Sequence, residues 1–327
     1  MLKGPLDRRV GGVAEVRLGA TSKEGGTRGW GVVIGGARHM PLHLFEGRAP
    51  PPQLAPVVVE GEFRPPRPLR AALGEFVGDP VAWASFAVEE LGAKLIFVHF
   101  SGPLRGDVER SLKTLRRLLD EVRAPLIIGG PGDVERPHLD AEFLSRAAEE
   151  ASGERAALSY ATLDQYSEVA RAAREHGHAI VAYSPTDVNL AKQLNSNLLE
   201  AGLSKGDIIM DPTTAPLGWS FEYSYSTFER IRLLALQGDE LLQMPLMAAA
   251  CNAWAARESY AKRPELGPVE QRGVLWEAVT ALSYVAAGAD LVLVLHPEAY
   301  RLVSSVVDEL WSGAGARLSF EQLFEGG

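Results

Sequence analysis

Cysteine is almost absent from this sequence. Cys251 is the single cysteine among 327 residues. One thiol cannot close an internal disulfide, and alone it cannot hold a zinc ion or an iron-sulfur cluster, because both need several ligands. Any such cluster that works with this protein must therefore belong to another chain.

Long apolar runs and a surplus of positive charge are also missing. No stretch of 18 or more uninterrupted apolar residues occurs, and the segment Met1 to Asp7 lacks the apolar core of an export signal. Lys and Arg number 33 against 42 Asp and Glu, a net charge of -9. A negative surface does not favour binding to phosphate backbones. We therefore expect a cytoplasmic protein that binds neither membrane nor nucleic acid.

The common catalytic motifs are lacking too. The sequence contains no HExxH, no EF-hand loop, no GxGxxG after a strand, no GxxxxGK[ST] and no GxSxG. Carboxylates from separate strands could still converge on a metal. On these absences we predict no metal site and no catalytic residue in this chain.

The pattern that is present is a repeated strand-helix module. Apolar residues make up 46% of the chain, enough for a large core. Short β-branched runs alternate with amphipathic stretches and start about 33 residues apart, the length of one strand and one return helix. Eight such runs predict an α/β fold, a (β/α)8 TIM barrel, with strands at 57–59, 94–99, 126–128, 156–160, 179–183, 207–210, 245–250 and 291–295.

A second, smaller unit precedes the barrel. Two short strand patterns at 13–18 and 30–34 flank a polar, glycine-rich run at 21–26, which predicts a β-hairpin. Three prolines at 50–52 then break regular structure. We predict an N-terminal extension at 1–54, the barrel at 55–312 and a C-terminal tail at 313–327.

Functional residues of such a barrel gather at the C-terminal ends of its strands. Asp187 stands there just before a helix, where it is either an N-cap or a ligand, and Asp211 either forms a turn or contacts a ligand. Glu60 and Glu62 could share the mouth or form salt bridges, and His296 is better explained as a hydrogen-bonded strand end than as a metal ligand. The segment 211–226 is rich in aromatic and hydroxyl groups. In it we expect Phe221 and Tyr225 in the core and Tyr223 at the mouth.

Several blocks of residues resemble one family. They are Ser184-Pro185-Thr186-Asp187-Val188-Asn189, Asp211-Pro212-Thr213-Thr214, Glu222-Tyr223-Ser224-Tyr225, Gln243-Met244-Pro245 and Gly273-Val274-Leu275-Trp276-Glu277. Over most of residues 55–300 the chain resembles the small subunit of the corrinoid iron-sulfur protein, which is the delta subunit of the acetyl-CoA decarbonylase/synthase complex.

The resemblance implies a non-catalytic barrel that pairs with a larger subunit. That subunit carries the iron-sulfur cluster and the corrinoid (cobamide), and the barrel caps the cobamide during methyl transfer in the reductive acetyl-CoA pathway. The donor partner is a methyltetrahydropterin methyltransferase, and the acceptor is acetyl-CoA synthase/CO dehydrogenase. This sequence agrees with such a division, because it lacks Asp-x-His-x-x-Gly, which would place a histidine under cobalt, and a set of four cysteines.

The resemblance also suggests which residues contact the cofactor or the partner. We predict Thr186, Asp187, Asn189, Asp211, Thr213, Thr214, Tyr223, Gln243 and Met244. An alternative is a free-standing methyltetrahydropterin-dependent methyltransferase, although Ser101-Gly102-Pro103 stands where related pterin-binding barrels have an aspartate. A third, less specific alternative is a lyase barrel with a carboxylate-bound metal.

Overall fold

Eight parallel strands form the centre of the molecule. The computed structural model describes residues 9–43, 47, 49–133 and 135–312. The strands are β3 (Gln53–Glu60), β4 (Ile96–Phe100), β5 (Leu126–Gly129), β6 (Ala157–Ala161), β7 (Ala179–Tyr183), β8 (Ile208–Asp211), β9 (Met247–Ala249) and β10 (Leu291–Val294). They pair in the order β8-β7-β6-β5-β4-β3-β10-β9, and a parallel bridge between Met210 and Leu246 joins the two edges. The predicted (β/α)8 barrel is confirmed.

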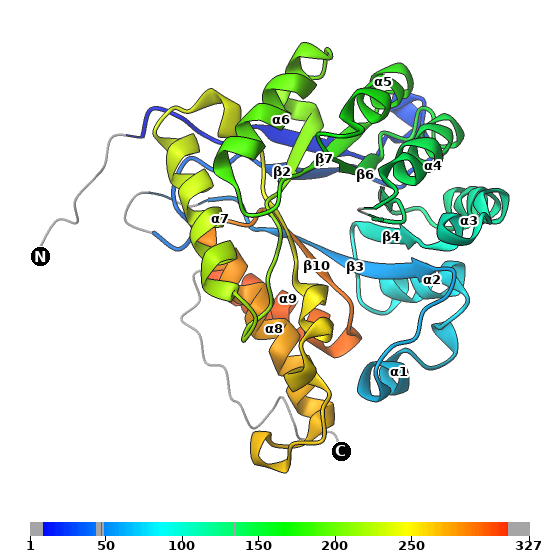
Figure 1. The fold of residues 1–327 in the computed structure, drawn as a ribbon, viewed down its shortest axis with the longest axis vertical. Coiled ribbons are helices and arrows are strands. Elements are labelled where there is room, and N and C mark those ends of the chain that lie inside the picture. The colour runs from blue at the N-terminus through cyan, green and yellow to red at the C-terminus, as the bar shows by residue number, and fades with distance from the viewer. Residues whose placement is uncertain (1–8, 44–46, 48, 134, 313–327) are drawn as a thin grey trace, which may run out of the picture.

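Helices surround these strands (Figure 1). They are α1 (Arg67–Leu73), α2 (Pro80–Glu89), α3 (Val108–Glu121), α4 (Pro137–Glu150), α5 (Tyr166–His176), α6 (Val188–Glu200), α7 (Phe221–Leu236), α8 (Val269–Ala287) and α9 (Pro297–Ser312). Each turns an apolar face to the sheet, as α3 does with Leu112, Leu115 and Leu119. Within the described ranges, none of the helices is long and apolar enough to cross a membrane.

The strands are buried on both faces. Every residue of β5, β8 and β10 is buried, because one face meets the barrel interior and the other meets the helices. This explains why the strands are visible in the sequence as short, continuous apolar runs. The connections then place the loops after the strands at one end, which we call the mouth, and the loops before the strands at the other end, which we call the bottom.

The N-terminal hairpin covers the bottom. Strands β1 (Glu15–Leu18) and β2 (Val32–Gly35) pair antiparallel, which confirms the predicted hairpin. The backbone N–H of Ala14 donates to the carbonyl of Gln243 (2.8 Å), and that of Gly19 donates to the carbonyl of Arg155 (2.9 Å). Both acceptors precede barrel strands. The hairpin therefore closes the bottom of the barrel and leaves the mouth uncovered.

A buried ion pair joins the hairpin unit to the barrel. Arg28 is 3% exposed, and its Nε lies 2.7 Å from Glu154 Oε2. The same guanidinium donates to the carbonyls of Val122 (2.6 Å) and Leu119 at the end of α3. Its charge is thus both paired and hydrogen-bonded, the condition under which a charge can be buried without a large penalty.

The predicted segment boundaries can be placed on this fold. Strand β3 starts at Gln53, two residues before the predicted start of the barrel segment, and α9 ends at Ser312. The predicted tail at 313–327 lies outside the described residues.

Candidate functional site

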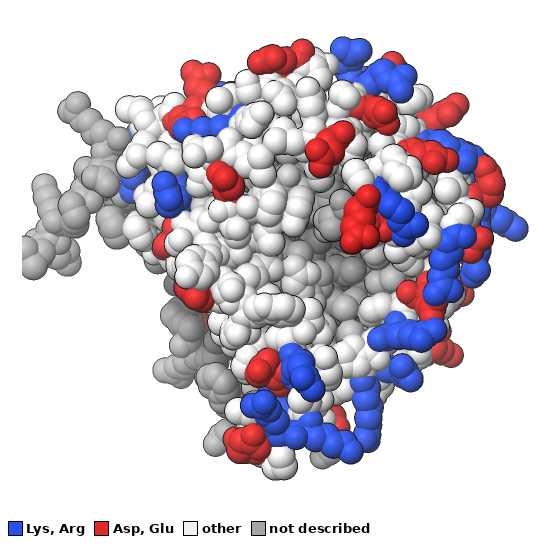
Figure 2. All heavy atoms as spheres, viewed as in Figure 1, with Lys and Arg blue, Asp and Glu red and all other residues white. Residues whose placement is uncertain are grey.

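A cavity of about 540 Å³ lies in the mouth. Figure 2 shows a hollow in this face, bordered mainly by uncharged residues, while charged side chains gather around the edge. The lining residues come from strands β6 to β9 and from the loops and helices that follow β5 to β9; they are Gly132, Asp133, Pro137, Asp140, Tyr160, Thr162, Leu163, Asp164, Gln165, Tyr183, Pro185, Leu190, Asp211, Thr213, Thr214, Ala249 and Asn252. These described lining residues include four aspartates and no lysine, arginine or histidine. The cavity therefore disfavours anionic groups.

Two of these aspartates are buried and have raised pKa values. Asp211, at the end of β8, is 3% exposed, and its Oδ1 accepts a hydrogen bond from the backbone N–H of Thr213 (2.9 Å). Burial raises the pKa of Asp211 to about 7. Asp140 on α4 accepts from the N–H of Gly132 (3.0 Å), and burial raises its pKa to about 6. Both carboxyls therefore titrate near neutral pH.

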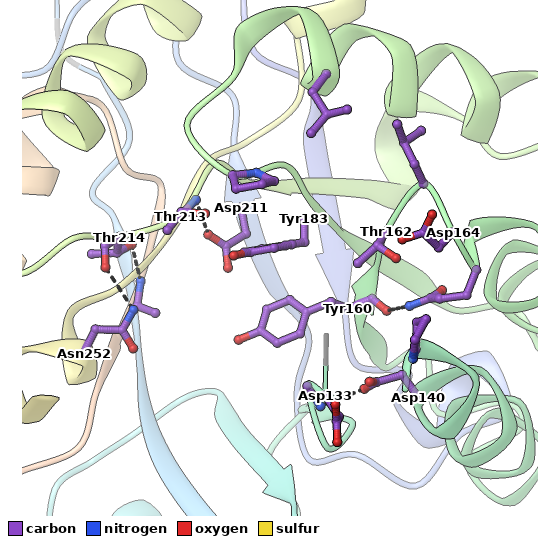
Figure 3. Close-up of a pocket in the computed structure, with 17 residues that line it drawn as sticks. Asp133, Asp140, Tyr160, Thr162, Asp164, Tyr183, Asp211, Thr213, Thr214 and Asn252 are labelled. Atoms are coloured by element: carbon purple, nitrogen blue, oxygen red, sulfur yellow. Dashed lines mark hydrogen bonds between the residues drawn. The ribbon is translucent and has the colours of Figure 1, made fainter. Parts of the chain in front are cut away.

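Two tyrosines project into the cavity from neighbouring strands. Tyr160 comes from β6 and Tyr183 from β7, and their ring centroids are 5.4 Å apart. In Figure 3 the Tyr160 ring lies between Asp211 on one side and Asp133 and Asp140 on the other. Burial raises the pKa of Tyr160 well above its usual value, so its phenol stays protonated. The two rings provide flat apolar surface beside the carboxyls.

Some polar atoms of this cavity have no protein partner. Thr162 Oγ1, Gln165 Oε1 and Thr213 Oγ1 are buried, and none has a hydrogen-bond partner among the described residues. The same holds for Ser184 Oγ, just after β7. Leaving such an atom unsatisfied costs about 1–3 kcal/mol. Four such atoms around one mouth are typical of a site that is completed by a ligand.

A second hollow adjoins the cavity, and we call it the trough. It has a volume of about 520 Å³ and shares Thr213, Thr214 and Asn252 with the cavity. The described residues lining it are all uncharged: Thr186, Thr213, Thr214, Ala215, Pro216, Trp219, Ser220, Tyr223, Ser224, Asn252 and Ala255. Trp219 is 59% exposed and Tyr223 is 67% exposed. The trough is thus an open, neutral surface with hydroxyl groups and two exposed aromatic rings.

Hydrogen bonds hold the loop that forms the trough. Thr214 Oγ1 accepts from the N–H of Ala249 (2.8 Å), and Asn252 Nδ2 donates to the carbonyl of Thr214 (2.9 Å). The hydroxyl of Tyr284 donates to the carbonyl of Ala215 (2.8 Å). The loop is therefore fixed by side chains from the segment after β9 and from α8, and its surface is preorganised.

Two threonines of the mouth adopt a backbone conformation that β-branched residues rarely take. Thr186 has φ +43° and Thr213 has φ +70°. The N–H of Thr186 donates to the carbonyl of Pro212 (3.1 Å), so the loops after β7 and β8 hold each other. Left-handed conformations of such residues cost about 1–3 kcal/mol and cluster at functional sites.

Five of the nine predicted contact residues lie together. Asp211, Thr213 and Thr214 line the cavity, and Thr186 and Tyr223 line the trough. This placement is consistent with their predicted role and does not test it. As expected, Tyr223 lies at the mouth. Phe221 and Tyr225 are only partly exposed, and both pack against the core.

Asp187 and Asn189 lie at the start of α6. Asp187 Oδ1 accepts from the N–H groups of Asn189 (2.8 Å) and Leu190 (3.2 Å), so Asp187 is the N-cap of the helix. Both side chains are exposed, and neither is among the described residues that line the two hollows.

Gln243 and Met244 lie at the other end of the barrel. Both precede β9, and the part of a chain that enters a barrel strand lies at the bottom. Gln243 Nε2 donates to the carbonyl of Ala235 (3.3 Å), and Met244 is 1% exposed beside Asn195. The structure does not bring these two predicted residues to the mouth.

The remaining candidates at strand ends have structural partners. Glu60 is 2% exposed and accepts from Ser111 Oγ (2.9 Å), whereas Glu62 is exposed and pairs with Arg64 and Arg105. The two glutamates therefore face different surroundings. His296 is a hydrogen-bonded strand-end residue, as expected, because its Nδ1 accepts from the N–H of Glu298 (3.1 Å).

Sequence reasoning missed Asp140, Tyr160 and Tyr183, which line the cavity. A signal for Asp140 exists in the glycine run that follows β5. A Cβ atom at Gly130 would lie 2.2 Å from Asp140 Oδ1, so this glycine makes room for the carboxylate. In the described part of the chain, no three His, Cys, Asp or Glu side chains are grouped as a metal ion would need.

The fold and the mouth together define a (β/α)8-barrel protein with a preorganised, uncovered mouth. Solved dihydropteroate synthases share this fold. The enzyme of Xanthomonas albilineans with 4-aminobenzoic acid has a TM-score of 0.55 at 15% identity, covering 85% of this chain and 96% of that one. The enzyme of Stenotrophomonas maltophilia has a TM-score of 0.54 at 15% identity, covering 82% and 95%. At this identity the likeness concerns the fold alone.

The sequence itself identifies the family. Residues 15–306 match the family model of the CO dehydrogenase/acetyl-CoA synthase delta subunit. The chain is 43% identical to the acetyl-CoA decarbonylase/synthase complex subunit delta of Methanopyrus kandleri, over 93% of this chain and 76% of the relative. It is 41% identical to that of Methanothermobacter thermautotrophicus, over 92% and 77%. The chain therefore belongs to the CO dehydrogenase/acetyl-CoA synthase delta subunit family.

Proposed function

We propose that this chain is the barrel subunit of a corrinoid iron-sulfur protein within the acetyl-CoA decarbonylase/synthase complex. It pairs with a larger subunit that carries the cobamide and the iron-sulfur cluster. Its mouth covers the cobamide while a methyl group passes from a methyltetrahydropterin methyltransferase to acetyl-CoA synthase. Membership of the delta subunit family supports a role inside such a complex.

The trough is the observation that carries this proposal. Exposed aromatic side chains beside a preformed hollow are typical of binding surfaces, because each ring buries much apolar area at little cost in side-chain entropy. Trp219 and Tyr223 are the two most exposed aromatic side chains of the described chain. The trough is open and not enclosed, which suits a large flat ligand that another subunit presents.

The chain's own groups fit a macrocycle with neutral amide arms. A corrinoid supplies a cobalt ion that accepts and releases the methyl group. Thr186, Thr213 and Tyr223 would hold the amide side chains of the ring, because their hydroxyls both donate and accept hydrogen bonds. Thr213 Oγ1 has no partner among the described residues and can be satisfied in this way. Covering the ring would also exclude water from the reacting face.

The chain's lone thiol does not suggest chemistry of its own. Burial raises the pKa of Cys251, with smaller contributions from Glu277 and Asp211. A thiol that stays protonated is a poor nucleophile and a poor metal ligand. This supports a role in binding and shielding for this subunit.

The trough can be tested by measuring binding to the large, corrinoid-carrying subunit. We expect Trp219→Ala and Tyr223→Ala each to raise the dissociation constant at least about tenfold, as loss of a buried aromatic anchor does. Leu310→Ala is the control, because Leu310 is exposed near the end of α9, away from the mouth. Equal affinities for all three variants and the unaltered chain would contradict the proposal.

Asp211 favours one alternative function, a free-standing methyltetrahydropterin-dependent methyltransferase. A buried carboxyl in a cavity with two tyrosines suits a nitrogen heterocycle that donates N–H hydrogen bonds. Titration of the purified chain with methyltetrahydropterin distinguishes the two functions. The methyltransferase would be favoured if the chain, without a second protein, bound methyltetrahydropterin with micromolar affinity and transferred its methyl group to a free corrinoid. We expect neither.

A further inference from the structure

The cavity and the trough differ in charge although they share a wall. The described residues lining the trough are uncharged, whereas those lining the cavity include Asp133, Asp140, Asp164 and Asp211 and no cationic side chain. Thr213, Thr214 and Asn252 belong to both. A ligand in the trough therefore has an acidic cavity at its edge.

Most arms of a corrin ring end in neutral primary carboxamides. Hydrolysis converts a carboxamide into a carboxylate of nearly the same shape but with a negative charge. The two forms also differ in hydrogen bonding, because the amide has two N–H donors and a carbonyl acceptor, whereas the carboxylate has acceptors only. An acidic cavity can therefore separate ligands that shape alone cannot.

We propose that the mouth cavity is a selectivity pocket that admits the amide arms of a corrinoid and rejects arms ending in a carboxylate, with Asp211 as the deciding residue. This inference rests on the proposed function, since it places in the cavity the arms of the corrinoid that the trough covers.

The contacts of Asp211 support this role. Its Oδ1 already accepts from the N–H of Thr213, and Figure 3 shows the carboxyl group directed into the cavity beside Tyr183. An amide arm can donate to this carboxyl, and the hydroxyls of Thr213 and Thr162, which lack partners among the described residues, can donate to its carbonyl. At pH 8, where Asp211 is ionised, a carboxylate arm would meet it without a donor between them, and like charges repel most strongly where water is excluded.

The other three aspartates make smaller contributions. Asp133 is paired with Arg136, so its charge is balanced at the rim. Asp140 lies on the opposite wall and accepts from the N–H of Gly132. Asp164 is exposed and screened by water. Asp211 is the buried carboxyl at the wall that the cavity shares with the trough.

Equilibrium dialysis of the full chain at pH 8 tests this inference. The probes are dicyanocobinamide, whose arms end in amides, and dicyanocobyrinic acid, whose arms end in carboxylates, and bound corrinoid is measured by its visible absorption. We expect the amide form to bind at least about tenfold more tightly, because an unfavourable charge interaction equivalent to one pKa unit weakens binding about tenfold. In Asp211→Asn we expect this ratio to fall to about twofold.

The variants separate a local charge effect from damage to the fold. Asn at position 211 keeps an oxygen that can accept from the N–H of Thr213. Asp140→Asn should lower the ratio less than Asp211→Asn does. Asp120→Asn, at an exposed position on α3 outside both hollows, makes the same change in net charge and should leave the ratio unaltered.

The outcomes distinguish this inference from the proposed function. If both corrinoids bind equally well, or if the ratio survives in Asp211→Asn, the selectivity pocket is refuted while the covering role stands. If neither corrinoid binds, the result counts against the proposed function and this inference together.

Discussion

The two ends of the barrel are built differently. At the bottom, the hairpin closes the barrel, and the buried Arg28 is paired with Glu154 and bonded to carbonyls at the end of α3. At the mouth, buried hydroxyls lack partners among the described residues, and Thr186 and Thr213 hold left-handed backbones. The hairpin and the buried ion pair thus close the bottom, whereas the hydroxyls around the cavity at the mouth are left for a ligand to complete.

Removing the bottom ion pair should cost the most stability. Arg28→Met leaves Glu154 buried without its partner, and we expect the free energy of unfolding to fall by about 3–5 kcal/mol. Arg116→Met is the control, because Arg116 pairs with Glu150 at the surface, where loss of a pair costs about 0–1 kcal/mol. Urea unfolding measures both. Similar losses in the two variants would show that the bottom is not a special source of stability.

The two ends should respond oppositely to pH. Burial raises the pKa of Asp211 at the mouth to about 7, so the folded state holds a proton that the unfolded state releases between about pH 4 and 7. Its contribution to stability is present below pH 4 and is lost as pH rises to 7. At the bottom, a hydrogen bond from Arg17 lowers the pKa of Glu24 to about 2, so its contribution is lost as pH falls through 2.

Asp211→Asn should therefore flatten the pH profile on the neutral side. Between pH 5 and pH 8 we expect the free energy of unfolding to change by about 1–3 kcal/mol less in the variant than in the unaltered chain. Burial also raises the pKa of Glu277 to about 7, so the contribution of Glu277 to the pH dependence remains in the variant. Glu24→Gln should not alter the profile in this range. Identical profiles for Asp211→Asn and the unaltered chain would refute the raised pKa.

Relief of the strained backbone should stabilise the mouth while it impairs binding. Thr213→Gly allows the left-handed φ without a Cβ clash, so we expect a gain of about 1 kcal/mol in unfolding free energy. Loss of the hydroxyl should weaken binding of the corrinoid-carrying subunit. Thr214→Gly is the matched control, because its φ is not positive and its hydroxyl bonds Ala249, and it should lose about 1 kcal/mol. Equal losses of unfolding free energy in Thr213→Gly and Thr214→Gly would contradict the claim that the backbone of Thr213 is strained.

The exposed rings of the trough should contribute least to stability. Tyr223→Ala is expected to change the free energy of unfolding by less than about 0.5 kcal/mol, since the side chain is 67% exposed. Leu18→Ala in the hairpin is the comparison, because the buried side chain leaves a cavity that costs about 2–5 kcal/mol. Thermal or urea unfolding measures both, and a large loss in Tyr223→Ala would mean that the ring supports the fold.

The sequence made the barrel predictable because its strands are buried on both faces. A strand such as β8 leaves a continuous apolar run, and the residues just after it, Asp211 to Thr214, then fall at the mouth by topology alone. Gln243 and Met244 were misplaced for a related reason. They belong to a block of family resemblance that leads into a strand, and resemblance does not indicate which end of the barrel a block occupies.

The inner lining of the cavity was harder to predict. Tyr160 and Tyr183 are at or near the ends of apolar runs, where an aromatic residue is consistent with either the core or the mouth. Asp140 belongs to a helix, and a carboxylate on a helix normally faces water. Its burial depends on the close approach of Gly130, a contact between two elements, and the glycine run after β5 does not indicate which side chain lies against it.

The measurement that tests the central claim most directly is amide hydrogen exchange on the chain alone and in complex with the large, corrinoid-carrying subunit. We predict slower exchange on complex formation in segments 184–189, 211–224 and 250–256 at the mouth, with little change in the hairpin at 15–35. Protection confined to the hairpin, or no protection at the mouth, would contradict the claim that the mouth covers the corrinoid.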